Sequence, residues 1–248
     1  MIEVESDRAV RVAALQQQVR ECFGCSLRPG KLREVTPVFG RGDPAARMVI
    51  VGEAPGPEEN EQGRPFIGPS GRLLSYLLAQ AGIDEASVWI TNTVACWPHE
   101  PGTNAVRRSQ AAKTCAPTEV QVRACVRTHL AEQLRLIRPA VVVTLGATAA
   151  CGVRGIPLSR AFAPQLCFER GDAPGVEGLV HDLDIGGDSS FTTKLLATYH
   201  PAYLLRRSFR TGMQPSKHAE AACVVRTFEA ARVLTLQTQR EAAQKGDK

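Results

Sequence analysis

Long apolar runs are missing from this sequence, and so is a signal-like N-terminal segment. No stretch approaches the roughly 20 consecutive apolar residues that a membrane-spanning helix needs. The first ten residues, MIEVESDRAV, carry acidic side chains where a secretory signal would have an apolar core. These absences argue against a membrane partner and lead us to expect a cytoplasmic protein.

A strong excess of charge of one sign is also missing. Lys and Arg number 30 and Asp and Glu number 25, which gives a net charge of +5. This mild basicity is compatible with a polyanionic partner but does not by itself identify one. Apolar residues make up 44% of the chain and charged residues 22%, as in ordinary folded proteins. Only the polar tail at 237–248 is expected to be flexible.

Cysteine, in contrast, is plentiful, with eight residues in the chain. A reducing cytosol disfavours disulfides, so some of these thiols need another explanation, and a metal centre is the most direct one. Cys22 and Cys25 form a C-x2-C pair that follows an expected helix rather than a strand, which favours zinc or iron–sulfur over thioredoxin-like chemistry. Cys96 and Cys125 can complete such a site, and Cys115 is the rival of Cys125.

Four short runs rich in β-branched residues predict strands, and helical patterns lie between them. The strands are expected at Arg47–Gly52, Val88–Val94, Ala140–Leu145 and Lys194–Tyr199. The helices are expected at Arg8–Cys22, Gly71–Ala81, Thr118–Ile137 and Ala219–Leu236. Unbroken apolar strands are typical of a parallel sheet buried on both faces. The alternation predicts a three-layer α/β/α sandwich, and the absence of a convincing linker predicts a single domain over 1–248.

Polar and aromatic residues stand out near the carboxyl ends of three expected strands, where open α/β sheets bind ligands. Glu53 ends the first strand region, and Phe66 follows in a loop flanked by Gly and Pro. Asn92 lies at the end of the second strand and His200 follows the fourth. Taken alone, Asn92 reads as a strand-end residue and His200 as a capping or core histidine. Phe66 has the features of a stacking platform for a planar ligand.

The segment after His200 reads as a basic loop with an apolar tip. Leu204 is placed to insert into a nucleic-acid stack, and Arg206 and Arg207 to contact the phosphates around it. Two further segments, Glu100–Ala116 and Gly152–Ser190, have no clear period and are expected to be long loops.

These pieces, taken in order, resemble the uracil-DNA glycosylase superfamily and most closely its iron–sulfur family 4. The matching motifs are the C-x2-C pair, GEAPG with EQGRPFIGPSGRLL, NTVACWP, PTEVQVRAC, LGATA and HPAYLLR. The resemblance covers about Cys22 to Arg207. It implies a central four-stranded parallel sheet, a [4Fe–4S] cluster and uracil-containing DNA, single- or double-stranded, as the partner of a monomer.

The resemblance also implies roles for individual residues. The cluster ligands would be Cys22, Cys25, Cys96 and Cys125, because Cys125 ends the PTEVQVRAC segment. Phe66 would stack on a flipped uracil, Asn92 would read its N3/O4 edge and His200 would bond to O2. Gly52, Ala54, Pro55 and Gly56 of the GEAPG motif would line the base pocket. Either Glu53 or Glu59 would handle the attacking water.

The sequence departs from the family at several positions. Asn60 stands where an acid is usual, and Ala202 replaces the serine of the usual HPS motif. An insertion at Thr103–Ala116 contains Arg107 and Arg108, which could contact DNA.

A basic insertion there is shared with the UdgX type, which uses a loop histidine to bond covalently to DNA. The aligned position here is roughly Thr114, and His99 is the only histidine in the segment. Turnover is therefore the favoured hypothesis. Cross-linking and non-catalytic DNA binding by an iron–sulfur protein remain as alternatives.

Overall fold

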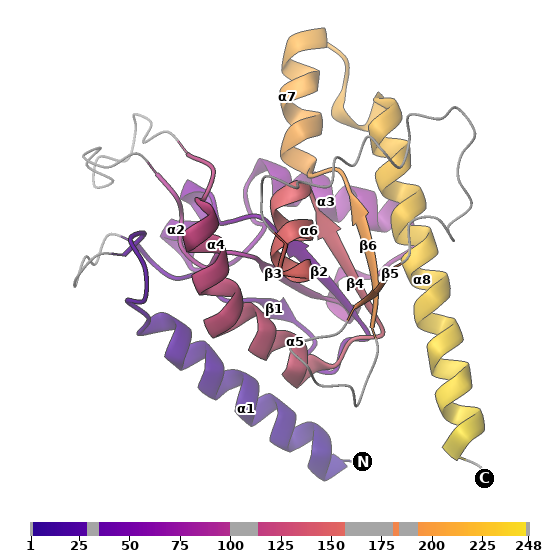
Figure 1. The fold of residues 1–248 in the computed structure, drawn as a ribbon. Coiled ribbons are helices and arrows are strands. Elements are labelled where there is room, and N and C mark those ends of the chain that lie inside the picture. Colours follow the sequence, from indigo (N-terminus) through magenta and orange to yellow (C-terminus); the bar gives the residue numbers. More distant parts are fainter. Residues whose placement is uncertain (1, 29–34, 100–113, 157–180, 184–192, 247–248) are drawn as a thin grey trace.

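The computed structural model describes residues 2–28, 35–99, 114–156, 181–183 and 193–246 (Figure 1). At its centre is one sheet with the strand order β1-β3-β2-β4-β6-β5. The four expected strands are β2 (Met48–Gly52), β3 (Trp89–Asn92), β4 (Val141–Leu145) and β6 (Thr193–Thr198). They pair in parallel, β3 with β2, β2 with β4 and β4 with β6.

The sheet as a whole is mixed and has six strands, because a short strand is added at each edge of the four parallel ones. The added strands β1 (Arg41–Gly42) and β5 (His181–Leu183) pair antiparallel at the two edges. Each is only two or three residues long. A segment this short carries too few alternating positions to produce a recognisable sequence period.

Helices cover both faces of the sheet, so the expected α/β/α sandwich is observed (Figure 1). Val49 and Val51 of β2 pack with the cluster that includes α1 (Ile2–Arg20) and α5 (Ala131–Ile137). Met48 and Ile50 of the same strand pack with the opposite cluster, which includes α3 (Pro69–Gln80) and α8 (Ala219–Gly246). Successive strand residues point to opposite faces, so a strand covered on both sides must be apolar throughout.

The expected helix at Thr118–Ile137 is continuous but not uniform. Thr118 caps α4 (Glu119–Cys125) by accepting a hydrogen bond from the Gln121 amide. A π-helical turn, η2 (Val126–Leu130), follows directly after Cys125 and leads into α5. Such turns insert one residue into the helical ladder and re-aim the side chains around them.

Two regions differ from the sequence expectation. The segment after His200 is not a loop but a helix, α7 (Pro201–Thr211), because Pro201 occupies its first turn and the His200 side chain caps it. Helix α8 continues to Gly246 through the segment expected to be a flexible tail, because Gln, Arg, Glu, Ala and Lys there are good helix formers.

The remaining helices are short or lie at strand ends. They are α2 (Pro57–Gln62), α6 (Ala147–Arg154) and the 3₁₀ turns η1 (Glu85–Ser87) and η6 (Pro215–Lys217). Within the described residues, none of the helices has the length and apolar character needed to span a bilayer.

Candidate functional site

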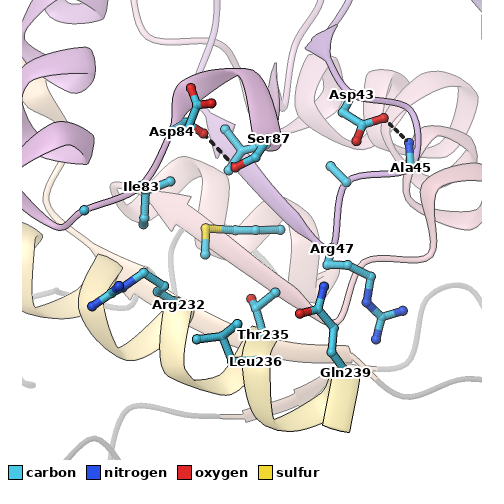
Figure 2. A pocket seen from close by; sticks show the side chains of 14 residues that line it. Asp43, Ala45, Arg47, Ile83, Asp84, Ser87, Arg232, Thr235, Leu236 and Gln239 are labelled. Carbon is cyan, nitrogen blue, oxygen red and sulfur yellow. Dashed lines mark hydrogen bonds between the residues drawn. The ribbon is translucent and has the colours of Figure 1, made fainter. Parts of the chain in front are cut away.

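Two cavities of nearly equal size lie at opposite ends of the sheet. One, of about 480 Å³, lies at the amino ends of β2 and β3 beside α8 (Figure 2). Its acidic residues serve local turns, since Asp43 accepts a hydrogen bond from the Ala45 amide and Asp84 from the Ala86 amide. The other, of about 470 Å³, lies at the carboxyl ends of the strands, where ligands of this sheet type bind. The second cavity is therefore the candidate ligand site, because of its position and its chemistry rather than its volume.

The cavity at the carboxyl ends brings together the polar and aromatic residues that the sequence singled out. Its lining includes Glu53, Ala54, Pro55, Gly56, Glu59, Phe66, Asn92, Ala202, His200 and Arg206. These residues come from the ends of β2, β3 and β6 and from the helices that follow. The topology therefore joins segments that are more than a hundred residues apart in the chain.

Phe66 is held in place by two glycines that leave no space for a side chain. A Cβ atom on Gly52 would lie 2.4 Å from Phe66 Cζ and 2.5 Å from Asn92 Oδ1. A Cβ atom on Gly71 would lie 2.1 Å from the Phe66 carbonyl carbon. Phe66 itself has a φ of 53°, in the left-handed region that non-glycine residues rarely occupy. Such strain at a cavity wall is typical of functional residues.

Asn92 is buried, with 6% of its surface exposed, and its Oδ1 atom has no hydrogen-bond partner among the described residues. Buried polar atoms in folded proteins nearly always have a partner, because an unpaired one costs about 1–3 kcal/mol. The amide also lines the cavity. Asn92 is therefore suited to accept a hydrogen bond from a ligand.

His200 is held as a neutral hydrogen-bond donor. Its Nδ1 atom accepts a hydrogen bond from the Ala202 amide at 3.1 Å. Burial, and to a lesser extent the nearby Arg206 guanidinium, lowers the pKa of His200 to about 4. In a neutral imidazole whose Nδ1 accepts, the proton resides on Nε2. His200 also lies beside Phe66, with ring centroids 6.0 Å apart.

Both carboxylate oxygens of Glu59 accept hydrogen bonds from backbone amides. Its Oε2 accepts a hydrogen bond from the Gly56 amide at 3.1 Å. Its Oε1 accepts from the Ile67 and Gly68 amides at 3.1 and 2.8 Å. This carboxylate thus ties the start of α2 to the start of α3 and fixes the loop that carries Phe66.

Glu53 is the less constrained of the two carboxylates. It is half-buried, and its Oε2 accepts a hydrogen bond from the Thr148 hydroxyl at 2.6 Å. Thr148 lies in the LGATA segment at the start of α6, and its role was not apparent from sequence patterns. The threonine orients Glu53 and leaves carboxylate lone pairs available to a ligand. Asn60, where the family often has an acid, instead accepts a hydrogen bond from the Thr36 amide.

A hydroxyl group, that of Thr114, lies at the rim of the cavity. Thr114 lines the cavity and accepts a hydrogen bond from the Trp97 indole at 3.0 Å. The His99 ring stacks on Trp97, with centroids 5.0 Å apart, and its Nδ1 lies 3.2 Å from the Trp97 carbonyl oxygen. His99 is thus engaged with Trp97 and is not among the residues that line the cavity.

The four cysteines assigned as ligands are neighbours. The pKa of Cys96 is raised to about 12, mainly by burial and then by the thiols of Cys125, Cys25 and Cys22. Burial also raises the pKa of Cys125 to about 11, with smaller contributions from Cys25 and Cys22. In the described part of the chain, however, no three His, Cys, Asp or Glu side chains are arranged to hold a metal ion as they stand.

The residues expected to contact DNA differ in their burial and in their contacts. Leu204 is fully buried in the core on one side of the sheet, which corrects its assignment as an inserting residue. Helix formation causes this, since it turns Leu204 inward. Arg207 donates a hydrogen bond to Glu220 of α8 at 2.6 Å, whereas Arg206 is exposed and lines the cavity. Arg107 and Arg108 lie outside the described residues.

Comparison with known proteins agrees with this geometry. Residues 39–224 match the model of the uracil DNA glycosylase superfamily. The chain is 35% identical to a type-4 uracil-DNA glycosylase of Thermotoga maritima over 77% of this chain and 82% of the relative. It is 33% identical to the type-4 enzyme of Archaeoglobus fulgidus, over 77% of this chain and 81% of the relative. The chain therefore belongs to the uracil DNA glycosylase superfamily.

Proposed function

We propose that this protein excises uracil from DNA by hydrolysing the N-glycosidic bond, which leaves an abasic site. The observation that carries the proposal is the unpaired Oδ1 atom of buried Asn92, beside Phe66 and His200 in one cavity. The type-4 uracil-DNA glycosylases among its relatives support the same activity.

Asn92 accounts for the choice of base. The N3–H group of uracil would donate to Oδ1, and the Asn92 amide nitrogen would donate to O4. Cytosine has an acceptor at N3 and a donor at C4, so both contacts would be lost. A buried amide left without partners discriminates strongly between such similar ligands. The uracil must leave the base stack to reach this depth, and Phe66 would supply the surface on which it stacks.

His200 and Glu53 account for bond cleavage. As the glycosidic bond breaks, negative charge develops on uracil and positive charge on the sugar. The Nε2–H group of neutral His200 would donate to uracil O2, and one preorganised donor of this kind lowers the barrier by about 3 kcal/mol. Glu53, oriented by Thr148, would position the attacking water and stabilise the sugar cation. Glu59 is excluded from this step by its three backbone bonds.

We propose further that Cys22, Cys25, Cys96 and Cys125 hold a [4Fe–4S] cluster. The raised pKa values of buried Cys96 and Cys125 support this set, because Cys22 and Cys25 lie close enough to contribute to both shifts. A cluster binds the thiolate form and would offset the cost of burying it. When bound, the cluster would link the end of α1, the segment after β3 and the end of α4. Hydrolysis transfers no net electron, so we assign the cluster a structural role.

Excision assays on uracil-containing DNA test the proposed activity. We expect alkali-labile abasic sites and free uracil with both single- and double-stranded oligonucleotides, and none with cytosine in the same position. Glu53→Gln serves as the matched inactive control. Intact, folded protein that releases no uracil from either substrate would refute the proposal.

A further inference from the structure

Helix α7 continues the wall of the cavity outward into solvent. It begins directly after His200 and projects from the carboxyl end of the sheet (Figure 1). Ala202 and Arg206, one helical turn apart, both line the cavity. Residues at i, i+4 and i+7 lie on one helix face, so Phe209 extends the stripe that starts at Ala202. Arg210 lies beside this stripe.

The opposite side of α7 is fully engaged with the protein. Leu204 is completely buried, and Arg207 is ion-paired with Glu220 of α8 at 2.6 Å. Tyr203 stacks on Tyr199, with ring centroids 5.4 Å apart. The helix is therefore anchored, and its outward stripe has a fixed orientation relative to the cavity.

The outward stripe exposes an aromatic ring between two cations. Phe209 is 94% exposed, the highest value among the exposed large hydrophobic residues of the described chain. Arg206 and Arg210 are exposed as well, and the described residues provide no ion pair to either. We call Arg206, Phe209 and Arg210 the outer ridge. An exposed aromatic flanked by arginines matches the chemistry of a nucleic-acid strand, in which bases stack on rings and phosphates pair with guanidinium groups.

We propose that the outer ridge binds the DNA strand that flanks the flipped uracil, with Phe209 stacked on an unstacked base and the two arginines on adjacent phosphates. This inference rests on the proposed function. Phe209 is nine residues beyond His200, which corresponds to about 13 Å along the helix. That length equals about four base steps of B-form DNA. The ridge would thus bind a nucleotide outside the cavity, without sequence preference.

Steady-state excision on two single-stranded substrates tests the ridge. One is a long strand with uracil at its centre, and the other is a short strand with two nucleotides on each side of the uracil, too short to reach Phe209. We expect Phe209→Ala to raise KM roughly tenfold on the long strand, since stacking on one base is lost. On the short strand KM should stay unchanged, and kcat should stay unchanged on both.

Two further variants serve as controls. Phe209→Trp keeps a stacking surface and should retain wild-type KM on the long strand. Val233→Ala removes another exposed apolar side chain, on α8, where Val233 is 49% exposed. This variant should have the wild-type KM on both substrates. An unchanged KM of Phe209→Ala on the long strand overturns the inference, and so does an equal loss on both strands, because that indicates a structural role.

Failure of the proposed function is distinguishable from failure of the ridge. If the wild-type protein releases no uracil, the ridge is tested by fluorescence anisotropy with a long uracil-free single strand. Phe209→Ala should then weaken binding by a similar factor. Equal affinities of the wild type and the variant overturn the inference independently of catalysis.

Discussion

Glu53 and Glu59 both line the cavity, and their different hydrogen bonds support the proposal that Glu53 is catalytic and Glu59 structural. Glu59 accepts three backbone hydrogen bonds, and Glu53 accepts one from Thr148. Glu59→Gln weakens charge-assisted bonds and should lower the free energy of unfolding by about 2 kcal/mol. This corresponds to a fall in Tm of about 4–8 °C. Differential scanning calorimetry should show this fall for Glu59→Gln alone.

Glu53→Gln should have the reverse profile, with an unchanged Tm and a kcat reduced at least a hundredfold, as is typical when a general base is lost. Thr148→Val is the companion variant, because it leaves Glu53 present but unoriented and should give a smaller loss. A Glu53→Gln enzyme with near-normal single-turnover rates would show that another group positions the attacking water.

The ionisation of His200 is a second property of a single residue. Its pKa is lowered to about 4, so the folded protein keeps the ring neutral while an unfolded chain protonates it below about pH 6.5. Catalysis that needs the neutral ring should therefore persist through pH 5–6. NMR titration checks this, since the His200 Hε1 signal, assigned by its loss in His200→Gln, should not shift between pH 8 and pH 5. A midpoint near 6.5 would contradict the neutral-donor role.

The sequence predicts individual cavity residues best where they belong to recognisable motifs. Asn92 and His200, which the sequence places at the ends of expected strands, line one cavity together with Phe66 from the loop. Thr148 was not foreseen, because a threonine in a Gly- and Ala-rich turn carries no periodic signal. The sequence could not distinguish the roles of Glu53 and Glu59, because both are acids in one stretch after β2. The structure distinguishes their hydrogen-bond partners.

The helix that carries Cys125 is irregular. The π turn η2 begins immediately after Cys125, so the α4 and α5 portions of the helix are rotated relative to one another. Before the π turn Cys125 lies near Cys96, and after it Leu134 and Ile137 lie in the core.

The proposed cluster gives a prediction for these elements. Anaerobically purified protein should be brown and contain about four iron atoms per chain, as a [4Fe–4S] assignment requires. Cys125→Ser should lower the iron content and the Tm together, whereas Cys115→Ser should change neither. Colourless protein with bound zinc, or iron loss in Cys115→Ser only, would contradict the ligand set.

The strands were predictable as elements and α7 was not. Runs such as 141–145, buried at every position, leave a pattern that is easy to recognise. The sequence at 200–207 predicts a basic loop with an apolar tip. Pro201 in fact occupies the first turn, where it favours a helix, and this placement also buries Leu204.

For the molecule as a whole, the direction of the parallel strands distinguishes its two ends. Among the described residues two cavities have similar volumes, and of these the one at the carboxyl end combines an aromatic surface, an unpaired amide and a neutral imidazole. The layer architecture was predictable from the alternation of strands and helices. The edge strands and the full length of α8 were not, because very short strands and polar helices lack an apolar period.

The arrangement of the cavity rim predicts turnover rather than adduct formation. Thr114 stands at the rim, and His99 stacks on Trp97. We therefore expect no protein–DNA band that survives boiling in denaturant when the protein is incubated with uracil-containing DNA. Thr114→His is the informative variant, because it restores an imidazole at this position. A stable band from the wild-type protein that His99→Ser abolishes would favour cross-linking instead.

The unpaired oxygen of Asn92 also has a consequence for what happens after cleavage. In the proposed function Asn92, Phe66 and His200 bind the base and not the sugar, so the liberated base would keep all of these contacts. Free uracil should therefore compete with substrate and slow the enzyme as product accumulates, whereas free cytosine should not. Occupancy of the cavity by free base, rather than cleavage, would then limit the rate wherever uracil concentrations are high.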